Sequence, residues 1–233
     1  MLRAVYDNAR TTTRNPTLLA ARAGTTKAAA EAFLRDEASS QVSTQWKKPP
    51  QSGHNYTPSG APASNWQADV IYLDDYRGVN DKRKAILTVL NTTSRYAAAR
   101  PLLNSKAPTV AAALEDILEQ LADEELPITV LRVDGGSEFK GETTALLASR
   151  GIEKEQTEPF THYKLSRTDR FHRTLRHRIG EHFEREQTHR WIDALPDIIA
   201  NLNETPHQTL ARVLGRPTAP ADVTPADEER IRA

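Results

Sequence analysis

Three aspartates stand at positions in the sequence from which they could build one site. Asp69 lies within an alternating, β-prone stretch, WQADVIYL, and Asp134 directly follows a short apolar stretch, PITVLRV. Gly135 and Gly136 allow the chain to turn after Asp134, and loops that follow strands often carry catalytic groups. Asp169 lies near the start of a long basic segment.

Three carboxylates suit the chemistry of phosphodiesters. Cleavage and transfer of a phosphodiester need an activated oxygen nucleophile and a stabilised leaving oxygen, and two divalent cations about 3.5–4 Å apart supply both. Because hard cations prefer oxygen ligands, we expect Asp69, Asp134 and Asp169 to hold two Mg²⁺ or Mn²⁺ ions. Taken singly, each aspartate is also explained as a turn former or a helix cap. Other acids near the same elements are interpreted as solvated or capping residues: Asp74, Asp75 and Glu142.

A basic segment surrounds Asp169. At 100° per residue, Arg173 and Arg176 fall within about 40° of Asp169 on a helix, and Phe171, Leu175 and Ile179 form an apolar stripe on another side. Arginines bind the phosphate backbone without reading base sequence. The alternative is a solvated helix face with Arg–Glu pairs, but residues 164–178 contain too few acids for such pairing. The residues predicted to bind DNA are Lys164, Arg167, Arg170, Arg173 and Arg176.

The order of predicted elements defines the fold class. Three β-prone stretches with tight connections, WQADVIYL, KAILTVLN and RYAAARPL, predict an antiparallel meander. The expected later elements are a helix over 108–122, a strand over 127–133, a helix over 142–149, a strand over 151–156, and helices over 165–186 and 191–202. This order indicates an α/β protein with a mixed central sheet flanked by helices. If the first and fourth strands are neighbours, Asp69 and Asp134 come close together.

Composition divides the chain into four parts. Residues 1–46 form a small helical segment, 47–64 a linker rich in Pro, Gly and Ser, 65–223 the core with its C-terminal helices, and 224–233 a charged tail. In the first part, Asn15 and Pro16 mark a helix start, Gly24 marks a helix end, and Thr25 or Thr26 can cap a second helix. This pattern fits a DNA-contacting helix-turn-helix and a plain helical hairpin equally well.

Composition also excludes several classes of function. The chain has no cysteine, which rules out disulfides, thiolate catalysis and zinc sites that need thiolates. Its 31 basic and 31 acidic residues balance, but what matters for nucleic-acid binding is where the charge sits. No stretch approaches the roughly 20 apolar residues of a membrane span, and the N-terminus lacks the apolar region of a secretory signal. We therefore expect a protein that neither enters a membrane nor is secreted.

Several motifs together resemble a known family. WQADVIYL, AILTVLNTTSRYAAARPL, ITVLRVDGGSEFKG and KLSRTDRFHRTLRHRI, followed by NLNETPHQTL and GRPTAPADV, resemble the retroviral-type integrase core of the DDE integrase/transposase superfamily. The likeness covers about residues 64–223. TLLAARAGTTKAAAEAFLRDE followed by KKPP resembles the N-terminal part of integrases from Polinton (Maverick) elements.

The resemblance implies a ribonuclease-H-like fold with a two-metal site made by Asp69, Asp134 and Asp169. It implies trimming of DNA ends by water and attack of the new 3′-hydroxyl on target DNA. The expected partners are element ends, target DNA and further copies of the chain. The expected location is the nucleus of a eukaryotic host, or otherwise the cytoplasm or a virion.

One departure from the family pattern bears on activity. Asp169 stands where the family usually has glutamate, so its side chain is one methylene shorter, and metal geometry is sensitive to such a change. Three functions therefore remain open. The chain is an active integrase or transposase, an integrase-derived DNA-binding protein with an impaired site, or a metal-dependent nuclease without strand transfer.

Overall fold

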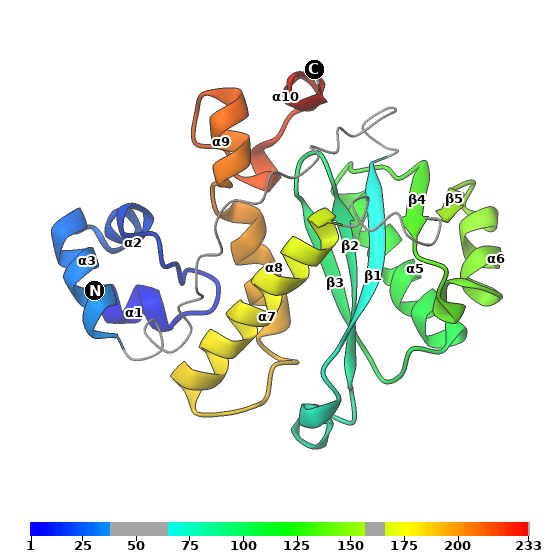
Figure 1. Cartoon of the computed structure of the whole chain (residues 1–233), viewed down its shortest axis with the longest axis horizontal. Coiled ribbons are helices and arrows are strands. Elements are labelled where there is room, and N and C mark those ends of the chain that lie inside the picture. The colour runs from blue at the N-terminus through cyan, green and yellow to red at the C-terminus, as the bar shows by residue number, and fades with distance from the viewer. Residues whose placement is uncertain (38–64, 157–165, 233) are drawn as a thin grey trace. The chain divides into compact units, whose positions relative to one another are not determined.

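The computed structural model describes residues 1–37, 65–156 and 166–232 (Figure 1). The predicted linker 47–64, the end of the N-terminal segment and Lys164 lie outside the described residues. The chain divides into two compact units. The first combines Met1–Gly53 with Arg173–Asn201, and the second combines His54–His172 with Leu202–Ala233. The long helix α7, Ser166–Glu186, contributes residues to both units.

A five-stranded mixed sheet forms the centre of the second unit. Its strands are β1 (Trp66–Tyr72), β2 (Ala85–Asn91), β3 (Ala97–Leu102), β4 (Val130–Val133) and β5 (Glu153–Gln156). Their order is β3-β2-β1-β4-β5. β1–β2 and β2–β3 pair antiparallel, whereas β1–β4 and β4–β5 pair parallel. The predicted meander is confirmed. The first and fourth strands are neighbours, which is the condition under which Asp69 and Asp134 come close together.

Tight turns connect the antiparallel strands. The 3₁₀ helix η2 (Asp74–Val79) follows β1, and Asp81 and Lys82 then adopt φ values of 52° and 61° in the predicted turn. Between β2 and β3, Arg95 has a φ of 68°, and its N–H donates to the carbonyl of Asn91 over 2.9 Å. Non-glycine residues rarely adopt this left-handed conformation, so the hairpin holds Arg95 in a strained geometry.

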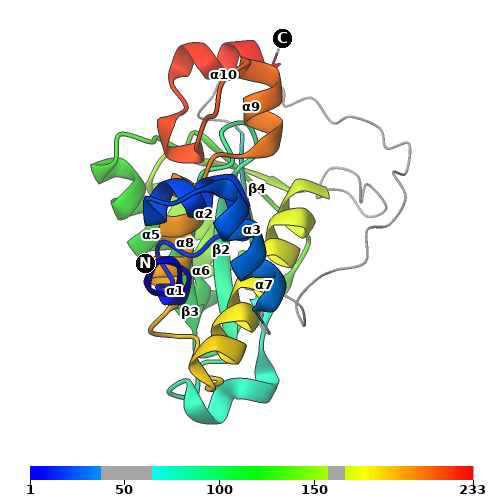
Figure 2. The ribbon, with the colours of Figure 1, turned by 90° about the vertical axis from the view of Figure 1, so that its left-hand side faces the viewer.

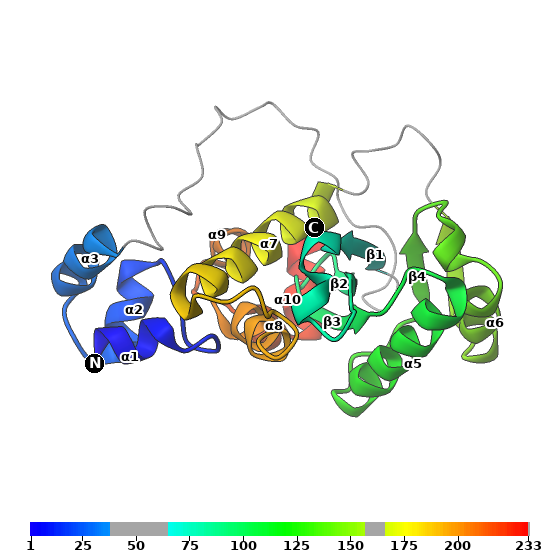
Figure 3. The ribbon, with the colours of Figure 1, turned by 90° about the horizontal axis from the view of Figure 1, so that it is seen from below.

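One face of the sheet is covered by α5 (Ala107–Asp123) and α6 (Glu142–Ser149), which lie on the same side of the strands in Figure 3. Leu114 and Ile117 of α5 join Leu87 and Val89 of β2 in the main core cluster. All four side chains are fully buried. Truncating one such leucine to alanine typically costs about 2–5 kcal/mol, so this layer provides the stable base from which the opposite face of β1 presents its side chains.

The C-terminal part of the second unit is more helical than its composition indicates. α8 (Leu195–Glu204) starts four residues later than the predicted helix over 191–202. It is followed by α9 (Gln208–Leu214), the 3₁₀ helix η5 (Pro220–Asp222) and α10 (Pro225–Arg232). The segment expected to be a charged tail is therefore mostly helix. Thr224 Oγ1 accepts the N–H of Asp227, whose carboxylate accepts from Thr224 N, and this reciprocal capping begins α10.

Three short helices open the first unit (Figure 2). They are α1 (Leu2–Asp7), which the sequence pattern does not predict, α2 (Pro16–Ala23) and α3 (Lys27–Asp36). Asn15 caps α2 by accepting from Thr17 N and Leu18 N, and Gly24 ends it in the left-handed conformation. Thr26 caps α3. Tyr6, Leu19, Ala20 and Ala30 form the small core of this cluster.

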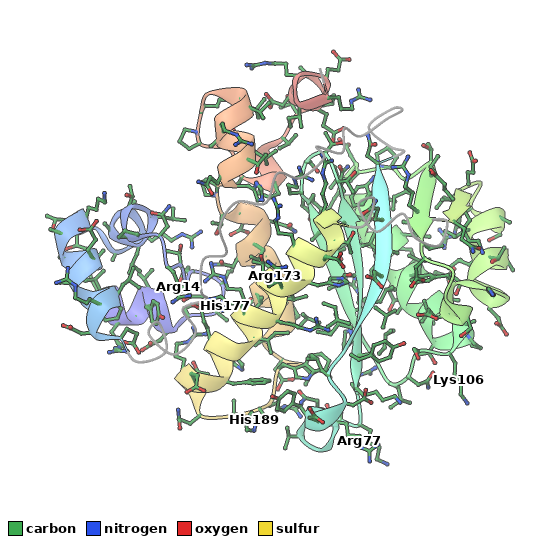
Figure 4. All side chains as sticks on the ribbon, viewed as in Figure 1. Arg14, Arg77, Lys106, Arg173, His177 and His189 are labelled. Carbon is green, nitrogen blue, oxygen red and sulfur yellow. The ribbon has the colours of Figure 1, made fainter. Side chains whose placement is uncertain are left out.

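A buried charge network joins the N-terminal segment to α7 within the first unit. Arg14 Nε lies 3.1 Å from Oε1 of Glu181, and Arg178 Nη1 lies 2.9 Å from Oε2 of Glu181. Arg14 and His177 lie side by side in Figure 4, and their Nη1 and Nε2 atoms are 2.6 Å apart. The Glu181 side chain is only 2% exposed, so its charge depends on these basic neighbours.

None of the helices in the described part of the chain is long and apolar enough to cross a lipid bilayer.

Candidate active site

Strand alternation places Asp69 on the sheet face opposite α5. Trp66, Ala68 and Val70 of β1 belong to the core under α5. Successive side chains of a strand point to opposite faces, so Gln67 and Asp69 point to the other face. The Asp69 side chain is 24% exposed, which leaves part of its carboxylate open to solvent. Asp69 Oδ1 accepts the N–H of Val70 over 2.7 Å.

Parallel pairing of β1 and β4 brings Asp134, at the carboxyl end of β4, next to Asp69 of β1. In the register, Gln67 is paired with Arg132, and two residues further along both strands lie Asp69 and Asp134. Asp134 directly follows β4, and its Oδ1 accepts the N–H of Gly136 over 3.0 Å. This bond closes a turn at the strand end and fixes the carboxylate beside the loop.

The first turns of α7 lie against β1 and β2. Thr168 is buried and its Oγ1 donates to Oε1 of Gln67 over 2.7 Å. His172, one turn later, is 7% exposed, and its Nε2 lies 2.8 Å from Oγ1 of Thr88. These two contacts anchor the part of α7 that carries Asp169, whose own side chain is exposed.

His172 also lies next to the first aspartate. Its Nδ1 is 3.6 Å from Oδ2 of Asp69. Thr88 pairs with Asp69 in the β1–β2 register, and Thr88 Oγ1 donates to the Asp69 carbonyl over 3.1 Å. His172 is therefore held between Thr88 and Asp69, where it restricts the orientation of the Asp69 carboxylate. The sequence shows His172 beside Asp169 but does not predict this role, because the role depends on which strand meets α7.

The acids near the carboxyl ends of β1 and β4 act on one another electrostatically. The pKa of Asp69 is raised from 3.8 to about 6, mainly by burial and in smaller part by the negative charges of Asp134, Asp169 and Glu138, against the lowering effect of the Val70 N–H. Like charges raise a carboxyl pKa only at short range in a partly desolvated setting. The three predicted aspartates therefore share one electrostatic environment.

Glu138 is a fourth acid at the site. It lies in the 3₁₀ helix η3 (Ser137–Phe139), four residues after Asp134. Its carboxylate folds back over Gly136, where an added Cβ would lie 2.4 Å from Glu138 Oε2. Position 136 therefore needs glycine for this conformation of Glu138. The sequence DGGSEF contains a signal for this placement, since a glutamate four residues after an aspartate at a strand end can fold back toward that aspartate.

The donor set fits a hard divalent cation, because it consists of carboxylate oxygens. Within the described ranges, however, no group of three or more His, Asp or Glu side chains is arranged to hold a metal ion. The two observations concern different distances. Charge repulsion acts over several ångströms, whereas ligand geometry requires oxygens within about 2–2.6 Å of an ion. The acids are close enough to act on one another, but in the described residues they are not arranged as a set of metal ligands.

The predicted DNA-binding arginines of α7 are divided between the two units. Arg167 Nη1 donates to the carbonyl of Thr92 over 2.8 Å, and Arg170 is exposed; both belong to the second unit. Arg173, labelled in Figure 4, and Arg176 are exposed and belong to the first unit. Among the predicted DNA-binding residues that the structure describes, only Arg167 and Arg170 therefore belong to the unit that contains the three aspartates.

The sheet order, the flanking helices and the acids at the β1–β4 edge define a ribonuclease-H-like α/β domain. The integrase core domain family matches residues 60–162 of the chain. The catalytic core domain of BIV integrase is similar in fold, with a TM-score of 0.53 at 19% identity, over 70% of this chain and 95% of that one. The predicted fold is confirmed, and the resemblance is supported by the match of residues 60–162 to the integrase core domain family and by the similarity of the fold to an integrase catalytic core.

Two further relatives extend the comparison. A chain from the intasome of simian T-cell lymphotropic virus, in complex with a PP2A regulatory subunit, has a TM-score of 0.61 at 14% identity, over 87% of this chain and 65% of that one. An uncharacterized transposon-derived protein of Caenorhabditis elegans is 23% identical over 140 residues, 60% of this chain. The chain spans about half the length of this curated relative, 48%.

Proposed function

We propose that the chain is a polynucleotidyl transferase of the integrase/transposase type, which trims DNA ends and joins them to target DNA. Asp69, Asp134 and Asp169 would hold two Mg²⁺ or Mn²⁺ ions. The observation that carries the proposal is the mutual repulsion of the acids, which contributes to the raised pKa of Asp69, about 6. Crowded carboxylates that cost the apo fold energy are a ready site for cations, because a cation removes the repulsion.

Each residue of the site has a distinct role in this proposal. When bound, the cations supply an activated oxygen nucleophile and stabilise the leaving oxygen. Asp69 and Asp134 provide a rigid part of the site, since backbone N–H groups hold both carboxylates. Asp169 comes from the exposed side of α7 and closes the site. Arg167 and Arg170 lie within one turn of Asp169 and would bind phosphates of the DNA strand.

The proposed partners follow from the substrate. DNA ends and target DNA must be present together, and the related viral chain was solved in an intasome. We therefore infer that the chain acts as a homo-oligomer. In a eukaryotic host it would work in the nucleus, where target DNA is found. The Polinton (Maverick) relationship of the N-terminal segment remains a proposal from its sequence.

The direct test is an end-processing and joining assay. Purified protein is incubated with short duplexes that carry the terminal sequences of the element, in Mg²⁺ or Mn²⁺. We expect trimmed and joined products from the wild type. Asp134→Asn should lose both products while binding DNA normally in Ca²⁺, and Asp123→Asn, an exposed acid at the end of α5, should keep both. Normal products from Asp134→Asn would refute the assignment.

The shorter side chain at position 169 can be tested in the same assay. Glutamate restores the usual family residue, so Asp169→Glu should raise the rate with Mg²⁺ if reach limits the wild type. Asp169→Asn should abolish products, because it removes the charge without changing the shape. An unchanged rate in Asp169→Asn would exclude this residue from the site.

Two observations favour a second candidate, an integrase-derived DNA-binding protein with an impaired site. Across the described residues, no three acids are already arranged as metal ligands, and Asp169 is exposed. This candidate predicts DNA binding without cleavage in either metal, including after Asp169→Glu. A nuclease without strand transfer would cleave duplexes but yield no joined product, so the joining step separates all three functions.

A further inference from the structure

A second cluster of charged groups lies where three elements of the second unit meet. Arg95 comes from the β2–β3 hairpin, Arg167 and Arg170 come from the first turns of α7, and His207 precedes α9. All four belong to the same compact unit. Their side chains are basic or neutral donors, so an anion is the ligand class that they would attract.

Two arginines of the cluster converge on one oxygen. Arg167 Nη1 donates to the carbonyl of Thr92 over 2.8 Å, and Arg95 Nη1 donates to the same carbonyl. Two like-charged guanidiniums therefore lie within a few ångströms of each other. The Thr92 N–H and hydroxyl both donate to the carbonyl of Asn65, over 2.7 and 3.0 Å, which fixes the shared carbonyl. This arrangement preorganises the two cations before any ligand is bound.

The hairpin that carries Arg95 is rigid and strained. Asn91 Oδ1 accepts from Thr93 N over 2.8 Å and Ser94 N over 3.1 Å, which forms the turn. Arg95 then takes a φ of 68°. A left-handed conformation in a non-glycine residue costs about 1–3 kcal/mol, and such strain is often retained at functional sites. The turn itself is made by Asn91, so it does not require a long cationic side chain at position 95.

His207 contributes a neutral donor. Its Nδ1 accepts the N–H of Thr209 over 3.2 Å, and its backbone N–H donates to the carbonyl of Thr218 over 2.9 Å. Because Nδ1 is an acceptor, the neutral ring carries its proton on Nε2. Burial, with the charges of Arg95 and Arg170, lowers the pKa of His207 to about 4, so the ring is neutral at pH 7.

The charges that act on Arg95 are those of its arginine neighbours. Burial, together with the charges of Arg167 and Arg170, lowers the pKa of Arg95 to about 9. Glu228 accepts from Asn91 Nδ2 of the same hairpin, but its charged neighbour is Arg232. Guanidiniums held together in a partly buried place repel one another, and a bound phosphate would remove that cost.

We propose that Arg95, Arg167, Arg170 and His207 form a site for one phosphate of a DNA backbone. Guanidiniums match phosphate oxygens in a bidentate geometry, and the His207 Nε2–H adds a neutral donor. Arg167 and Arg170 flank Asp169 on α7, so a strand held here would pass the acids. The choice of DNA as the source of the phosphate rests on the proposed function, whereas the anion site rests on the cluster itself.

The test measures DNA binding in EDTA, where no cleavage occurs, by fluorescence anisotropy over a range of KCl concentrations. We expect Arg95→Gln and Arg170→Gln to weaken binding about fivefold or more and to reduce the salt slope by about 1. Arg77→Gln is the matched control, because Arg77 is an exposed arginine in η2, at the far end of β2 from the hairpin. It should change affinity by less than about twofold.

Folding is checked separately. Arg170 is exposed, so Arg170→Gln should not lower the melting temperature, and it keeps the test valid if Arg95→Gln folds poorly. Asp123→Asn, at an exposed acid that ends α5, should bind DNA as the wild type does. Because binding is measured in EDTA, a loss of affinity in Arg170→Gln is independent of the proposed catalysis. Equal DNA affinity and salt slope in Arg170→Gln and the wild type would overturn the proposal.

A second experiment, with inorganic phosphate, identifies the source of the anion. Inorganic phosphate should stabilise the wild type against heat more than Arg170→Gln, and it should compete with DNA. If phosphate stabilises the wild type through Arg170 while DNA affinity is unchanged in both variants, the site binds a free anion. That result would overturn its assignment to the DNA backbone.

Discussion

The burial of Asp69 among other acids makes a prediction that needs neither DNA nor metal. Its pKa is raised from 3.8 to about 6, so the folded protein holds this proton more tightly than the unfolded chain does. Stability therefore falls as the pH rises from about 4 to about 6, and it stays lower above that range. At about 1.4 kcal/mol per pKa unit, the penalty at pH 7 is at most roughly 3 kcal/mol, and the partial exposure of the side chain reduces it.

Replacing Asp69 by asparagine removes the charge and keeps the shape. The amide oxygen can still accept the Val70 N–H, which is 2.7 Å from Oδ1 in the wild type. In EDTA at pH 7.5, we expect the free energy of unfolding to rise by about 1–3 kcal/mol, as measured by urea denaturation. The gain should disappear below about pH 4, where the aspartate is protonated in both states.

The controls separate this effect from a general change of charge. Asp74→Asn removes an exposed acid, whose side chain is 53% accessible, and should leave stability within about 0.5 kcal/mol. Adding Mg²⁺ should stabilise the wild type and not Asp69→Asn, because a ligand stabilises only the state that binds it. If Asp69→Asn is less stable than the wild type in EDTA at pH 7.5, burial and charge repulsion do not make the charged form of Asp69 costly.

Two further predictions concern buried polar contacts, one inside each unit. Thr88→Val removes the hydroxyl that lies 2.8 Å from Nε2 of His172, a side chain that is only 7% exposed. The free energy of unfolding in urea titrations should therefore fall by about 1–3 kcal/mol. An unchanged midpoint would show that water replaces the hydroxyl. Glu181→Gln removes the buried charge that lies 3.1 Å from Arg14 Nε, which should cost about 3–5 kcal/mol. Limited proteolysis should then cut the N-terminal helices faster, and a wild-type cleavage rate would contradict the buried-pair interpretation.

The fold is predictable from the sequence because its signals are local and redundant. Alternation marks β1, and the glycines after Asp134 mark the end of β4. The order of the elements leaves open which strands are neighbours, and the pairing of Gln67 with Arg132 shows that β1 and β4 are. In the first unit, Asn15, Gly24 and Thr26 act as the caps that their types indicate.

The helices that sequence patterns miss have weaker signals. The sequence of α10, PADEERIR, indicates a tail because it is charged and follows a proline-rich stretch. The motif Thr224-Pro-Ala-Asp227 does carry a capping signal. α1 lacks a side-chain cap and any periodic run longer than six residues. Composition alone cannot identify either helix, since both depend on packing of a few buried side chains.

The site is predictable only in part. The types and positions of Asp69 and Asp134 point to one sheet edge, whereas the pairing of His172 with Thr88 depends on which face of α7 meets β2. Glu138 reaches the acids because its side chain folds over Gly136. The sequence does not single out Arg95, because only the folded hairpin brings it to Arg167. Such relations arise from tertiary contacts, which a single sequence does not encode in a readable pattern.

The parallel pairing of β1 with β4 has a consequence for synthesis of the protein. The strands are adjacent in space, but β2, β3 and α5 must be made between them, and Asp169 follows later still. Contacts between distant parts of a chain form late, and domains complete their folding after the ribosome has released the necessary residues. A growing polypeptide therefore cannot bring all three aspartates together until α7 has emerged.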